Sequence, residues 1–123
     1  MQPVVHFELH SGDLSKTLPF FEKLFGWKLQ KFEGGPHEYW LATTAEPGKP
    51  GIGGGIMKSP DGQPRTVNTI QVPSVDEYVG KIQAAGGQIC VPKMAIPGVG
   101  WLAYGLDPCG VLFGIYTPDP TAK

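Results

Sequence analysis

The sequence contains one internal repeat, and this repeat constrains the fold more than any other feature. Residues 4–29 align without gaps with residues 65–90, and near the ends of the two copies Gly55 lies over Gly114. Few residues are identical between the copies, so the alignment depends on a shared pattern of strand, helix and glycine. A repeat of this size is typical of duplicated supersecondary units that complete each other's core. Three equivalent pairs carry different side chains: His6 and Val67, Glu8 and Thr69, His10 and Gln71.

The first copy predicts a strand, a helix and three further strands. Residues 4–10 alternate between two faces, as a strand requires. The helix is expected to start near Ser15 or Lys16, which leaves Pro19 in its first turn, and to end at Gly26. Strands are expected at residues 27–32, 38–44 and 52–58. The helix presents one apolar stripe, which we expect to be buried: Leu18, Phe21, Leu24 and Phe25.

The second copy repeats this order. A strand at 67–72 precedes a helix that Ser74 and Glu77 begin as a capping box, and a pair of glycines ends it. Strands are expected at 88–91, 101–106 and 111–116, and residues 59–64 form a linker rich in turn residues. The predicted fold class is α+β, with two βαβββ modules in a single domain over residues 1–123. Module one covers about 1–60 and module two about 65–120.

Composition narrows the function classes. The net charge is −1 and there is no long basic run, which argues against nucleic acid or an anionic membrane as a partner. No apolar run reaches the roughly 18 residues of a membrane span, and the N-terminus lacks the pattern of a signal peptide. A cytoplasmic location is therefore expected. Cys90 lies in an apolar run and is predicted to be a core residue, and Cys109 lies in a turn, so no disulfide framework is indicated.

The modules resemble a known family. Two βαβββ units in this length, together with the segment IPGVGWLAYGLDPCGVLFGIY at 96–116, resemble the glyoxalase / bleomycin-resistance / dioxygenase superfamily, also called the vicinal oxygen chelate superfamily. The chain is most similar to a metal-poor branch of small, single-domain, glyoxalase-like proteins. The resemblance implies that the modules curl into a mixed-sheet cup around a cavity and that the protein is a homodimer.

The resemblance also implies where a metal would bind. Enzymes of the family that use a metal take one ligand from the first and one from the last strand of each module. These positions fall on His6, Gly55, Val67 and Gly114, and neither glycine nor valine can ligate through its side chain. A catalytic divalent metal normally has three protein ligands, so the sequence predicts no metal and no other cofactor. A set formed by His6, Glu8 and His10 is an alternative, although three ligands from one strand are geometrically awkward.

The candidate site lies on the first strand. His6, Glu8 and His10 alternate along it and therefore share one face. We expect His6 and Glu8 to transfer protons, with an ionised Glu8 raising the pKa of both histidines. The predicted ligand-binding residues are His10, Thr69, Gln71, Trp40 and Trp101. The alternative is that these polar side chains lie on the solvated face of a sheet and have no function, and that the tryptophans only pack in the core.

The sequence leaves several functions open. The first hypothesis is a protein that binds a small organic molecule in the cup and acts as a metal-independent isomerase, lyase or hydroxylase-like enzyme. The second is a non-catalytic protein that sequesters such a molecule, as resistance proteins do. The third is a metal-dependent enzyme of the lactoylglutathione-lyase type with atypical ligands, and the fourth is a dimerising module without a ligand. The expected partners are a small molecule and a second copy of the chain, with no nucleic acid and no membrane.

Overall fold

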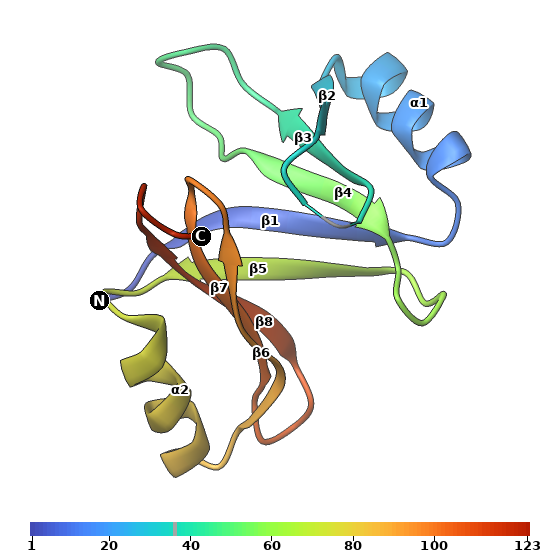
Figure 1. Cartoon of the computed structure of the whole chain (residues 1–123). Coiled ribbons are helices and arrows are strands. Elements are labelled where there is room, and N and C mark those ends of the chain that lie inside the picture. The colour runs from blue at the N-terminus through green and yellow to red at the C-terminus, as the bar shows by residue number, and fades with distance from the viewer. Residues whose placement is uncertain (36) are drawn as a thin grey trace. The chain divides into compact units, whose positions relative to one another are not determined.

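The computed structural model describes residues 1–35 and 37–123 and confirms an α+β fold with two βαβββ modules (Figure 1). Contacts divide the chain into two compact units, residues 6–67 and residues 1–5 with 68–123. Neither of the two helices in the described part of the chain is long and apolar enough to cross a membrane.

The first module consists of β1 (Val4–Ser11), α1 (Leu14–Phe25), β2 (Lys28–Phe32), β3 (Tyr39–Thr43) and β4 (Gly54–Lys58). Its strands lie in the order β2-β3-β4-β1. β1 and β4 are parallel, and the other two neighbouring pairs are antiparallel. β4 therefore lies between β1 and β3, so side chains from both of these strands can meet over it.

The second module has the same topology. It consists of β5 (Arg65–Gln71), α2 (Val75–Ala84), β6 (Gln88–Ile96), β7 (Gly100–Leu106) and β8 (Leu112–Pro118), with the strand order β5-β8-β7-β6. β5 and β8 are parallel, and α2 packs on β6, β7 and β8. The register repeats as well, because Glu8 lies opposite Gly55 and Thr69 lies opposite Gly114. The structure thus confirms the internal repeat that the sequence indicates.

Helix α1 starts earlier than expected. Asp13 is its N-cap, and the Asp13 side chain accepts a hydrogen bond from the backbone N–H of Ser15. Pro19 consequently lies inside the helix and not in its first turn. The expected end is confirmed, since Gly26 adopts a left-handed conformation with φ 71°. In α2 the predicted cap is also confirmed, because Ser74 accepts from the N–H of Glu77.

The two modules build their cores differently. In the second module, Val72, Val75, Ala103 and Ile115 form a buried cluster. In the first, an aromatic group lies on the side of the sheet that α1 covers: Phe7, Phe21 and Trp27, with the rings of Phe21 and Trp27 stacked 4.9 Å apart, and Phe25 contacts this group from the exposed edge.

Two expectations about burial are wrong. No residue of α1 is fully buried, and Leu24 and Phe25 of the predicted stripe are 60% and 58% exposed. Cys90, expected in the core, is exposed. It lies on β6, which continues past the predicted end at Val91 through irregular pairing around Pro92. A proline cannot donate to the strand ladder, so a bulge there lets the strand continue.

Candidate functional site

Strand β1 has polar side chains on one face and an aromatic side chain, Phe7, on the other. Phe7, between His6 and Glu8 in sequence, points to the α1 side, where its ring lies 5.7 Å from that of Trp27. His6, Glu8 and His10 point to the opposite side, because side chains alternate along a strand. The apolar contacts of Phe7 therefore fix the direction in which the polar residues face.

Four side chains on this face form one hydrogen-bonded row. His6 Nε2 lies 2.8 Å from the hydroxyl oxygen of Tyr39. The Tyr39 hydroxyl donates to Glu8 Oε2 at 3.0 Å, and His10 Nε2 lies 3.1 Å from Glu8 Oε1. We call these residues, in the order His6–Tyr39–Glu8–His10, the polar row. Three members come from β1 and one comes from β3.

Tyr39 was not among the predicted site residues. It reaches the row because β4 carries no side chain beneath it: a Cβ atom on Gly55 would overlap the Tyr39 hydroxyl. Gly54, the preceding residue, leaves space in the same way on the other face of the sheet, since a Cβ on Gly54 would overlap the Phe7 ring. The sequence offered one signal, which is the pair of adjacent glycines in a strand. Such glycines permit another group to approach the backbone closely.

The row is mostly shielded from water. Glu8 is 3% exposed and His10 is 6% exposed, while His6 and Tyr39 are half-buried. The interpretation of a solvated face is therefore wrong for Glu8 and His10. His6 and Tyr39 are therefore the members of the row that a ligand could contact directly, and His6 forms its end.

The pKa of His6 changes in the direction opposite to our expectation. Burial lowers it, because a low-dielectric environment disfavours the charged imidazolium, and the nearby Glu8 carboxylate offsets only part of this effect. Desolvation thus outweighs the neighbouring charge. At neutral pH His6 is consequently a neutral imidazole.

The hydrogen bonds assign the tautomer of this imidazole. A phenol has one proton, and Tyr39 donates it to Glu8. His6 Nε2 must then be the N–H that donates to the Tyr39 oxygen. In a neutral ring Nδ1 keeps its lone pair, so the exposed end of the row presents a proton acceptor.

This shift predicts how stability depends on pH. The unfolded histidine titrates at its ordinary pKa of 6.5 and the folded one at a lower value. Between these two pKa values the unfolded state binds more protons than the folded state. The free energy of unfolding therefore falls as the pH falls through this range, and His6 does not lower it well above pH 6.5. Urea denaturation between about pH 7.5 and pH 5.5 should therefore give a smaller loss of stability for His6→Gln than for the parent. Equal losses would contradict the lowered pKa.

Of the remaining ligand-binding candidates, two lie on β5. Thr69, the equivalent of Glu8, is 3% exposed, and its hydroxyl has no hydrogen-bond partner in the described part of the chain. A Cβ on Gly114 would lie 3.2 Å from that hydroxyl. Gln71 is half-buried, and its backbone N–H donates to Pro3. The second module therefore carries no ionisable group at the positions equivalent to the polar row.

The two tryptophans have other contacts. Trp40 follows Tyr39 on β3 and so faces the other side of the strand, and its indole N–H donates to Glu38. Trp101 donates to Asp119, lies under the Lys93 ammonium at 4.5 Å, and packs against the core of the second module. The structure does not bring Trp40 to the polar row.

The residues present do not fit a metal ion. Among the residues that the structure describes, no group of three His, Cys, Asp or Glu side chains is arranged to hold one. His6 is the one histidine at a ligand position of the metal-dependent relatives, and its Nε2 atom is hydrogen-bonded to the Tyr39 hydroxyl. The Tyr39 hydroxyl in turn occupies the space in which a ligand side chain at position 55 would begin.

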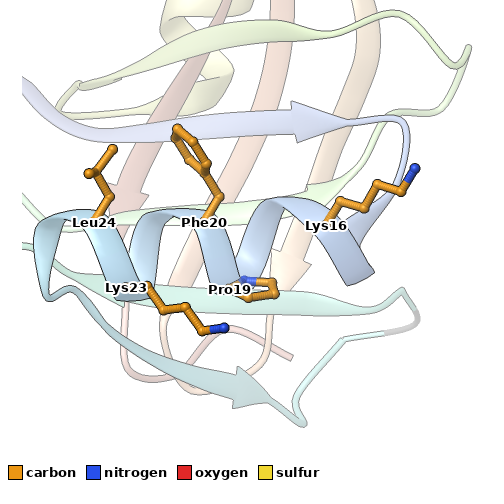
Figure 2. Close-up of a pocket in the computed structure, with 5 residues that line it drawn as sticks. All are labelled: Lys16, Pro19, Phe20, Lys23 and Leu24. Carbon is orange, nitrogen blue, oxygen red and sulfur yellow. The ribbon is translucent and has the colours of Figure 1, made fainter.

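A surface hollow of about 410 Å³ lies elsewhere, along α1. Figure 2 shows that all five lining side chains come from this one helix: Lys16, Pro19, Phe20, Lys23 and Leu24. A ligand site normally encloses its ligand between several elements and converges a few polar groups on it. The hollow has neither property, so we place the candidate site at the polar row.

Comparison with known proteins agrees with the fold. Residues 4–115 match the model of the Glyoxalase/Bleomycin resistance protein/Dioxygenase superfamily. Among solved structures, methylmalonyl-CoA epimerase from Mycobacterium tuberculosis is similar, with TM-score 0.71 and 15% identity over 95% of this chain and 88% of that one. A hypothetical protein from Bacillus halodurans C-125 has TM-score 0.72 and 18% identity over 99% and 98% of the two chains.

A third similar structure contains a ligand. It is a variant of the Streptomyces coelicolor methylmalonyl-CoA epimerase in complex with 2-nitronate-propionyl-CoA, with TM-score 0.68 and 13% identity over 100% of this chain and 99% of that one. No protein of curated function matches the sequence. At these identities the structural similarities establish the fold.

Proposed function

Because the chain belongs to the Glyoxalase/Bleomycin resistance protein/Dioxygenase superfamily, we propose that it binds a small organic molecule at the polar row and transfers a proton to and from it without a metal ion. The polar row carries this proposal. It ends in an accessible, neutral imidazole and continues through Tyr39 to a buried carboxylate. A positioned imidazole is an effective general base when its pKa lies near the pH at which the protein works.

The row supports chemistry with a single base. His6 presents one acceptor, Nδ1, and the equivalent positions of the second module carry Val67, Thr69 and Gln71, none of which can exchange a proton at neutral pH. A single base can remove a proton from a carbon acid and return it, on the same face, to a different atom of the molecule. The proposed reaction is therefore an isomerisation of a compound with an acidic C–H group.

The structural neighbours suggest compounds for the test. Two of them are named methylmalonyl-CoA epimerases, and epimerisation also begins by removing a proton from carbon. Native mass spectrometry of freshly purified protein should first identify any molecule that stays bound. That molecule and a panel of acyl-CoA thioesters would then be incubated with the protein in D₂O, with exchange of the acidic proton followed by NMR.

The site residues should affect binding of the identified molecule. His6→Ala should weaken binding by about 0.5–1.5 kcal/mol, or roughly 2- to 13-fold, because it removes a hydrogen bond to the ligand, and Glu8→Gln should weaken it less, because Glu8 acts only through Tyr39. Isothermal titration calorimetry measures this, and EDTA should leave the affinity unchanged. Lys28→Ala, an exposed change on β2, is the control. Parent-like affinity in both site variants would rule out the polar row as the binding site, and binding without exchange would make the protein a sequestering one.

We also propose that the chain forms a homodimer. Phe20, Leu24 and Phe25 on α1 are 56–60% exposed, and exposed apolar groups of this kind favour association. Pairing about a two-fold axis is the commonest way to cover such surface. Sedimentation velocity at micromolar concentration should give a dimer, and Phe20→Glu should shift it toward monomer. A parent protein that sediments only as a monomer would overturn this expectation.

A further inference from the structure

The position of Tyr39 in the polar row has a chemical consequence. Its hydroxyl oxygen receives a hydrogen bond from His6 and at the same time donates one to Glu8. A hydroxyl that accepts one hydrogen bond and donates another can receive one proton as it releases its own, and it stays neutral throughout. We propose that Tyr39 is a proton relay that connects the accessible His6 to the buried carboxylate of Glu8.

The relay rests on the proposed function, and its step balances. The carbon acid gives its proton to Nδ1 of His6, and its bonding electrons remain on the carbon. The proton on His6 Nε2 passes to the Tyr39 oxygen as the Tyr39 proton passes to Glu8 Oε2. The products are a carbanion, a neutral His6 with its proton on Nδ1, an unchanged phenol and a protonated Glu8. When the proton returns to a different atom of the carbanion, the transfers along the row reverse and Glu8 becomes a carboxylate again.

Two neighbours keep the relay aligned. His10 Nε2 lies 3.1 Å from Glu8 Oε1, and this contact leaves Oε2 for Tyr39. Gly55 supplies the space that the hydroxyl occupies, since a Cβ there would overlap it. His10 and Gly55 are therefore positioning residues, and neither passes the proton.

The alternative is that the Tyr39 ring only fills space over Gly55. Tyr39→Phe separates the two roles, because it keeps the ring and removes the hydroxyl. Gly55→Ala should displace the hydroxyl while leaving it in the protein. Gly53→Ala is the matched control, because the nearest atom to its Cβ would be the Ala42 carbonyl oxygen at 3.5 Å, an ordinary contact.

The experiment measures coupling between the two ends of the row without a ligand. In ¹⁵N-histidine-labelled protein at about pH 8.5, well above the ordinary histidine pKa, the His6 Nε2 resonance is recorded with and without Glu8→Gln. Through a relay, this substitution should move the resonance at least threefold further in the parent and Gly53→Ala backgrounds than in Tyr39→Phe or Gly55→Ala. A double-mutant comparison of this kind isolates the pairwise effect.

Equal displacements in the parent and Tyr39→Phe backgrounds would overturn the relay. If Gly55→Ala does not fold, Tyr39→Phe alone decides the outcome, because its ring keeps the packing. Failure of the proposed function is a separate result. It would appear as absence of binding or proton exchange in D₂O while the coupling through Tyr39 persists, whereas exchange without coupling would remove only the relay.

Discussion

Replacing Ile56 with alanine should lower the free energy of unfolding by about 2–5 kcal/mol, as removal of a fully buried branched side chain usually does. Ile56 is 0% exposed and lies on β4, opposite Leu9 of β1 and Trp40 of β3. Strand pairing on both sides holds the surrounding backbone in place, so the cavity left by the substitution cannot collapse easily. Urea denaturation followed by circular dichroism would measure the loss.

Leu41 provides the matched control for this prediction. It is an aliphatic residue of similar size on the neighbouring strand β3, but it is 39% exposed. Leu41→Ala should cost less than about 1.5 kcal/mol, because less apolar surface returns to water. If both substitutions cost the same, Ile56 would not be part of the core of the first module.

Glu8→Ala should have an effect of similar size, about 3–5 kcal/mol, although it removes a charged residue. The carboxylate is 3% exposed and accepts from both Tyr39 and His10. Without it, the buried His10 and the half-buried Tyr39 lose their acceptor, and an unsatisfied buried group costs more than an ordinary hydrogen bond contributes. From the sequence alone, a polar residue on a solvated face would cost under about 1 kcal/mol. The structure reverses that expectation.

Two further variants make this measurement specific. Glu8→Gln keeps the size and one acceptor oxygen, so it should cost clearly less than Glu8→Ala. Glu22→Ala, an exposed change on α1, should stay within about 0.5 kcal/mol of the parent. A cost for Glu8→Ala as small as that for Glu22→Ala would mean that the polar row does not form and that its face is solvated.

The features predicted correctly are those encoded locally. The alternation of β1 and the caps at Gly26 and Ser74 each depend on residues close together in sequence, and the repeat is this local pattern occurring twice. Asp13 was missed as the cap of α1, and the position of Pro19 moved with it. The position of a cap depends on which of several adjacent polar residues turns its side chain to the helix. Two such residues, Ser11 and Asp13, precede α1.

The candidate site was predicted only in part, because it depends on pairing between distant strands. His6, Glu8 and His10 could be placed on one face from their spacing alone. The role of Tyr39 requires the register of β3 and β1 on β4, which no local pattern specifies. The sign of the His6 pKa shift was missed for a related reason: the sequence reveals the neighbouring charge, but the depth of burial follows from tertiary packing.

The glycine at position 55 also restricts how a site of this kind can change during evolution. The Tyr39 hydroxyl and a side chain at position 55 exclude each other, since both need the same volume. A lineage that gains a ligand side chain at 55 must therefore either shorten residue 39 or turn its ring out of the polar row. A phenol and a ligand side chain are thus alternatives at this place, and a change from one to the other involves positions 39 and 55 together.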